Sequence, residues 1–175
     1  SPSGIVTVRG RSVSHSGKIF AKGRSGGKVN IISKDSIKLN GSILAQGSID
    51  KGGSVIFMSE KSINSTPKVV VDVSAPNKAG EIRSLAKTTN TSSGLFKANS
   101  SAGKGGKIDL TGNSVQISKS EISATGNKMG GKVRIGGEYL GGKKLTNTDN
   151  KNKQGFVTRF GDQPLIQNAK QTVVT

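Results

Sequence analysis

The sequence predicts an all-β fold, a parallel β-helix in which each coil of about 26 residues carries three short strands. Three observations support this prediction. A glycine recurs at nearly constant spacing, period-two alternation of apolar and polar residues follows each of these glycines, and equivalent positions carry similar residues from unit to unit. Period-two alternation is typical of half-buried strands. A unit of this size cannot bury its apolar side alone, so it must stack on its neighbours.

The recurring glycines, called marker glycines below, define the unit. They are Gly4, Gly27, Gly53, Gly80, Gly106 and Gly131, at intervals of 23, 26, 27, 26 and 25 residues. About 26 residues are too few for the four strands of a propeller blade, and the Leu/Asn spacing of leucine-rich repeats is absent. Glycines and polar residues separate the three alternating runs of each unit, where the chain must turn.

Four apolar columns remain in phase with the marker glycines. The first column consists of Val6, Val29, Val55, Ile82, Ile108 and Val133, and the second consists of Val13, Ile37, Ile63 and Val115. The third column consists of Ile19, Ile43, Val69, Phe96 and Ile122, and the fourth consists of Ala21, Ala45, Val71, Ala98 and Ala124. We expect the members of each column to stack along the inside of the tube, at the usual inter-strand distance of about 4.8 Å. The alanine column predicts a narrow part of the cross-section.

The repeat divides the chain into two parts. Residues 1–135 are predicted to form the β-helix coils, whereas residues 136–175 are predicted to leave the helix as a loop and return into a further, truncated coil. The loop is indicated by residues 146–155, which contain no apolar side chain, and Phe156 and Phe160 could hold its return against the flank. Both ends of a β-helix expose unpaired backbone, so we expect the chain to be a fragment of a longer protein.

The charge of the chain favours an anionic partner. Its 27 Lys and Arg residues exceed 10 Asp and Glu residues, for a net charge of +17, which attracts nucleic acid, acidic glycans or anionic lipid, or serves solubility alone. With one Tyr and no Trp, stacking of bases and specific nucleic-acid binding are not expected. No apolar run is long enough for membrane insertion. Lys28, Lys107, Lys132 and Arg134 occupy outward positions and are predicted to stack into a basic ladder that binds acidic glycans.

The sequence argues against an enzyme. His15 is the only histidine, and we expect it to be an exposed residue at a corner. The ten carboxylates occupy dissimilar repeat positions, so no paired acid and base is predicted. Glycine-rich segments such as "GKGGK" lack the "GK[ST]" ending of a phosphate loop. The absence of cysteine excludes disulfides and thiolate metal sites. No catalytic residue, metal site or cofactor is therefore expected.

Four Asn-x-Ser/Thr sequons are candidate glycosylation sites, at Asn40, Asn64, Asn90 and Asn99. In a chain this rich in Asn, Ser and Thr, two or three sequons would arise by chance.

A family resemblance rests on three segments. "GGKVRIGGEYLGG" (130–142) resembles the "GG-x-V-x-I-GG-x-Y-x-G" signature of filamentous-haemagglutinin-like exoproteins of the two-partner secretion pathway. "GGKIDLTGNSVQISKSEISATG" (105–126) and "VVVDVSAPNKAGEI" (69–82) are similar to coils of those proteins. The resemblance implies a right-handed β-helix that is secreted through an outer-membrane partner transporter to the surface of a Gram-negative bacterium. The "N-P-N-G" motifs of the amino-terminal secretion domain are absent.

The resemblance leaves several functions open, none of them with a family-wide catalytic residue. The first is a non-catalytic adhesin segment that attaches to host or neighbouring cells through surface receptors or acidic glycans, and the lysine-rich composition favours the high-molecular-weight adhesins. Such adhesins carry hexoses at sequons. The alternatives are a passive stalk of a contact-dependent inhibition toxin and an exoprotein that scavenges haem or a haem carrier.

Overall fold

The computed structural model describes residues 4–136 and 171–175, and within these ranges the chain is all β with parallel strands. The strands are β1 (Ile5–His15), β2 (Lys18–Phe20), β3 (Lys28–Leu39), β4 (Ser42–Leu44), β5 (Ser54–Ser59), β6 (Ser62–Ser65), β7 (Val70–Asp72), β8 (Glu81–Ala86), β9 (Thr89–Lys97), β10 (Lys107–Thr111), β11 (Ser114–Ser123), β12 (Lys132–Ile135) and β13 (Gln171–Val174). The described part contains no helix that could span a membrane.

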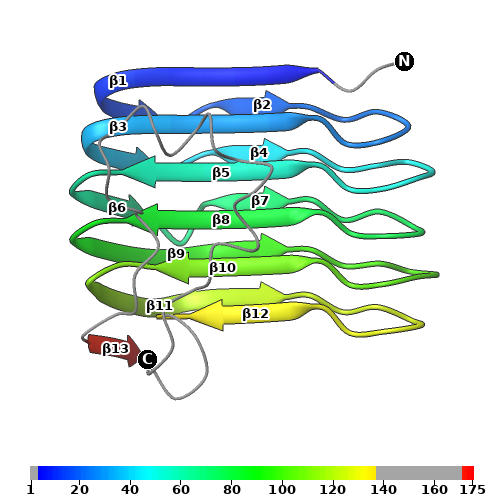
Figure 1. Cartoon of the computed structure of the whole chain (residues 1–175). Coiled ribbons are helices and arrows are strands. Elements are labelled where there is room, and N and C mark those ends of the chain that lie inside the picture. The colour runs from blue at the N-terminus through cyan, green and yellow to red at the C-terminus, as the bar shows by residue number, and fades with distance from the viewer. Residues whose placement is uncertain (1–3, 137–170) are drawn as a thin grey trace, which may run out of the picture.

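The strands stack as a β-solenoid of about five turns, with about 26 residues per turn (Figure 1). Each coil contributes to three faces. Face A contains β1, β3, β5, β8, β10 and β12; face B contains β1, β3, β6, β9, β11 and β13; face C contains β2, β4, β7, β9 and β11. The longer strands bend from one face to the next, and Gly94, with φ of 99°, lies at such a bend in β9. The predicted fold class is confirmed.

The first predicted column is confirmed residue by residue. Val6, Val29, Val55, Ile82, Ile108 and Val133 are successive register partners on face A. The four middle members are fully buried. They pack with Phe57 and Leu110 in one apolar core that fills the tube. Stacking of equivalent side chains therefore forms the core, as expected for a coil that is stable only on its neighbours.

The predicted third and fourth columns are wrong in the coil that begins at Gly53. Val71, and not Val69, pairs with Ile43 and Phe96. Val73 occupies the position that alanine holds in the other coils of the fourth column. Its N–H donates to the Lys97 carbonyl, in the same way as the Ala45 N–H donates to the Asp72 carbonyl. The cause is a turn before β7, closed by a hydrogen bond of 3.0 Å from the Val69 N–H to the Thr66 carbonyl. This turn shifts the strand by two residues.

The second column contains a polar member that the apolar pattern had left out. Asn90 is the register partner of Ile63 and of Val115, and its side chain is fully buried. Its Nδ2 donates to the carbonyls of Ser84 at 2.8 Å and Thr111 at 3.0 Å. Its Oδ1 accepts from the hydroxyls of Ser84 and Ser92. The amide is thus accommodated because all its hydrogen-bonding capacity is used.

Close contact between coils explains the marker glycines. A Cβ built on Gly53 would lie 2.1 Å from the Gly27 carbonyl oxygen, and one on Gly80 would lie 1.9 Å from that of Gly53. The same overlap recurs at Gly106 and Gly131, at 2.1 and 2.2 Å. Backbone occupies the space where a side chain would begin, so only glycine fits.

The outer side of face A is largely covered. By strand alternation, Ile32, Met58 and Leu85 point away from the core as register partners of one another, yet they are only 1–4% exposed. The neighbouring outward column is buried too, including Ile56 and Arg83. From β3 to β12, only the outward column nearest the start of each strand, which contains Lys28, reaches solvent. In β1, at the end of the stack, the outward residues Thr7 and Arg9 are exposed as well. On face A, a candidate surface site must therefore lie towards that edge.

The final predicted segment is described only in part. β13 pairs in parallel with β11 as a further strand of face B. The predicted loop excursion, together with Phe156 and Phe160, lies outside the described residues.

Candidate functional site

A loop closes each coil between face C and the next strand of face A. Each loop is held at its base by a hydrogen bond of 2.7–2.8 Å from a marker glycine N–H to the last carbonyl of face C, for example from Gly53 to Ala45 and from Gly106 to Ala98. We call these closing loops; they comprise residues 22–26, 46–52, 74–79, 99–105 and 125–130. Figure 1 shows them stacked beside one another at one edge of the solenoid.

The closing loops carry an uninterrupted ladder of lysines. Lys51 pairs with Lys78, and Lys78 pairs with Lys104, through isolated parallel bridges. All three side chains are exposed, and within the described ranges none forms an ion pair. Parallel pairing spaces their Cα atoms about 4.8 Å apart. Met129 continues the column in the next coil. The Lys51–Lys78–Lys104 ladder therefore presents a line of unneutralised positive charge.

A groove of about 1030 Å³ runs between the closing loops and the first outward column of face A. Its floor is formed by the glycine pairs that open the coils, such as Gly52–Gly53 and Gly105–Gly106. Lys51 and Lys78 line it from the loop side, and Lys28 from the strand side. A floor without side chains brings a ligand close to the backbone. We call this the basic groove, and its shape suits an extended anionic chain.

The structure brings three of the four predicted ladder residues to this groove. Lys28, Lys107 and Lys132 belong to one column on its wall. The column is not continuously basic, because Ser54 and Glu81 separate Lys28 from Lys107. Lys107 also lies 3.9 Å from the Glu81 carboxylate and 3.4 Å from that of Asp109. The predicted basic ladder is therefore interrupted at these positions, although the three lysines line one groove.

Arg134 does not belong to this column. It lies two residues beyond Lys132 and is 9% exposed. Its guanidinium donates two hydrogen bonds to the Asp109 carboxylate, from Nε at 2.6 Å and from Nη2 at 2.8 Å. Arg83 adjoins the same carboxylate from the other side, at 3.5 Å, and pairs with Glu81. Arg134 thus belongs to a buried ion-pair network, which is a structural role and not a ligand-facing one.

Sequence reasoning missed the three residues of the ladder, although a signal exists. Lys51, Lys78 and Lys104 each stand two residues before a marker glycine, in the triplets "KGG", "KAG" and "KGG". The apolar columns were aligned on residues that follow the marker glycines, whereas the lysines of the ladder precede these glycines. A search of every repeat offset for recurring charge would have found it.

The four sequons differ in accessibility. Asn40 and Asn64 are exposed, and Asn99 is half-buried. Asn90 is fully buried with both amide hydrogens donated to carbonyls, so the folded chain cannot present it for glycosylation. His15 is half-buried at the end of β1, with Nε2 3.4 Å from the Ser42 carbonyl oxygen, and is not the exposed corner residue that we expected.

Comparisons with known proteins do not add to this description. No family model, no curated protein and no solved structure matches the chain.

Proposed function

We propose that this chain is a non-catalytic segment of a secreted bacterial surface adhesin, which attaches to host or neighbouring cells by holding acidic glycans in the basic groove. The observation that supports this function best is the Lys51–Lys78–Lys104 ladder. Three exposed lysines stacked one coil apart, with no ion-pair partner in the described ranges, are suited to a polymer that carries charge at regular intervals.

The wider setting of the proposal comes from the resemblance of residues 130–142 to filamentous-haemagglutinin-like exoproteins. On that basis the protein would leave the cell through a partner outer-membrane transporter and act at the surface of a Gram-negative bacterium. A stacked solenoid suits this location because its strands support one another without disulfides, and the chain contains no cysteine.

The test uses heparin as the acidic glycan and compares two triple variants. The ladder variant carries Lys51→Gln, Lys78→Gln and Lys104→Gln. The control carries Lys18→Gln, Lys38→Gln and Lys68→Gln, three exposed lysines elsewhere on the solenoid. Both lose the same charge. At up to about 1 kcal/mol per contact, the ladder variant should bind about tenfold or more weakly by isothermal calorimetry in low salt, while the control stays close to wild type.

Three results would overturn the proposed mechanism. Equal weakening of both variants would show that net charge alone is responsible. Binding that persists above about 0.5 M NaCl would contradict an electrostatic attachment. Cells that display the ladder variant and attach as well as those with the wild type would favour a passive stalk.

A further inference from the structure

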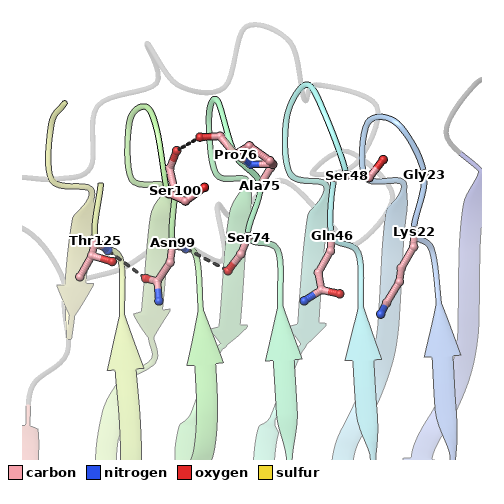
Figure 2. Close-up of a pocket in the computed structure, with 12 residues that line it drawn as sticks. Lys22, Gly23, Gln46, Ser48, Ser74, Ala75, Pro76, Asn99, Ser100 and Thr125 are labelled. Atoms are coloured by element: carbon pink, nitrogen blue, oxygen red, sulfur yellow. Dashed lines mark hydrogen bonds between the residues drawn. The ribbon is translucent and has the colours of Figure 1, made fainter. Parts of the chain in front are cut away.

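A second groove, of about 670 Å³, lies on the opposite side of the closing loops from the basic groove. Figure 2 shows a row of polar side chains along it, one from each coil. The row consists of Lys22, Gln46, Ser74, Asn99 and Thr125. Backbone hydrogen bonds of 2.8–3.3 Å connect neighbouring coils at this row. In each, the N–H of the residue that follows one member donates to the carbonyl of the next member, as the N–H of Ala75, which follows Ser74, donates to the Asn99 carbonyl. The row is therefore in register, with a spacing of about 4.8 Å.

The central side chains of this row are held in fixed orientations. Asn99 Oδ1 accepts hydrogen bonds from the Ser123 hydroxyl and from the Thr125 N–H, both at 2.9 Å. Its Nδ2 is therefore, by elimination, the donor end of the amide and carries two hydrogens. Gln46 Nε2 donates to the Asp72 carboxylate at 2.6 Å, which leaves Oε1 as an acceptor. Ser74 Oγ accepts from the Asn99 N–H at 3.1 Å and keeps its own hydrogen to donate.

The chemistry of this groove differs from that of the basic groove. Its lining contains no carboxylate and a single cation, Lys22, at one end. Ala75 and Pro76 add apolar surface from the overhanging loop. Beside Lys22, the Phe20 ring is 61% exposed, with the ammonium 5.8 Å from its centroid. Fixed donors together with an acceptor, apolar surface and little charge are features that sugar hydroxyls and ring faces match.

We propose that this second groove binds an uncharged, extended polysaccharide, with about one hexose per coil. A β-1,4-linked hexose chain is extended and advances per sugar by nearly the spacing of the coils, so successive sugars would each lie beside one member of the row. The inference does not depend on the lysine ladder or on the proposed attachment to acidic glycans. It assigns the closing loops two binding sides, one for anionic and one for neutral chains.

The test uses cellohexaose, a neutral extended oligomer, and maltohexaose, which has the same composition but a coiled shape. In two-dimensional NMR of the labelled chain, cellohexaose should produce saturable shifts at the amides of Gln46, Ser74 and Asn99, unchanged in 0.5 M NaCl. Maltohexaose should leave these signals in place. The Lys51, Lys78 and Lys104 ladder variant should bind cellohexaose normally, which separates this site from the basic groove.

Asn99→Asp is the decisive variant, because it keeps the Oδ1 acceptor for Ser123 and Thr125 but replaces the donor with an anionic oxygen. Affinity for cellohexaose should fall at least about tenfold, the loss expected for one unpaired polar contact. Asn64→Asp makes the same charge change on an exposed part of face B and should have no effect. The absence of saturable shifts, equal shifts with maltohexaose, or unchanged affinity in Asn99→Asp with a native-like spectrum would each overturn the proposal.

Discussion

Asn90 offers a sharp test of how the interior of the solenoid is assembled. Its neighbours in the second column are Ile63 and Val115, so an apolar residue of the same size would match the repeat better. Asn90→Leu makes this change with the same number of heavy side-chain atoms. If the column were held together by apolar contact alone, the substitution would stabilise the protein.

The structure predicts the opposite result. Four hydrogen bonds to the buried amide would be lost, two to carbonyls and two from the hydroxyls of Ser84 and Ser92. At about 1 kcal/mol each, their loss costs about 4 kcal/mol. Burial of the added apolar surface returns about 1–2 kcal/mol. The net loss in free energy of unfolding should therefore be about 2–3 kcal/mol.

Urea denaturation followed by circular dichroism measures this difference. Asn64→Leu is the matched control: Asn64 is the exposed neighbour of Ile63 in β6, and its substitution should change stability by about 0.5 kcal/mol or less. An Asn90→Leu variant as stable as the wild type, or more stable, would refute the reasoning. It would mean that the amide is not held by the network described above.

Two further predictions concern the backbone and the pH dependence. Gly53→Ala should lower the free energy of unfolding by about 1–3 kcal/mol or more, because the new Cβ overlaps the Gly27 carbonyl, whereas Gly4→Ala, with nothing within 4 Å, should be near neutral in the same urea assay. Hydrogen bonds from Lys61 and, to a smaller extent, from Arg11 lower the pKa of the Asp35 carboxyl. The ionised carboxylate therefore stabilises the folded chain above the unfolded pKa of about 4, and this stabilisation is lost as the pH falls through the lower folded pKa. Asp35→Asn should thus be less stable than the wild type at about pH 7, and urea midpoints should converge in strong acid; a constant difference would contradict this assignment.

Much of the fold could be predicted because the same residue pattern recurs in every coil. Marker glycines and the first apolar column define where each coil begins. Close backbone contact between coils forces the glycines to recur, and burial in the shared core does the same for the apolar column. The prediction failed where the repeat changed length. The turn that ends at Val69 adds residues inside a coil, and apolar residues at 69, 71 and 73 all fit an alternating pattern. Only the hydrogen-bonded register distinguishes them.

The candidate site was less accessible to sequence reasoning. A charged side chain is available to a ligand only if the equivalent position in the next coil does not carry the opposite charge, with which it would form an ion pair. Arg134 and Asp109 share the third position after their marker glycines, and their pairing removes Arg134 from the surface. Lys51 and Lys78 share an offset as well, but both are positive. Comparison of charges between equivalent positions separates the two cases, whereas outward orientation alone does not.

The stacking of the coils is the central claim, and methyl-to-methyl NOE spectroscopy of the Ile, Leu and Val-labelled chain tests it most directly. The structure predicts a continuous series of cross-peaks from Val29 to Val55, from Val55 to Ile82 and from Ile82 to Ile108. The absence of this series, or cross-peaks that instead join each of these residues to a partner at another repeat offset, would contradict the fold and both grooves built on it.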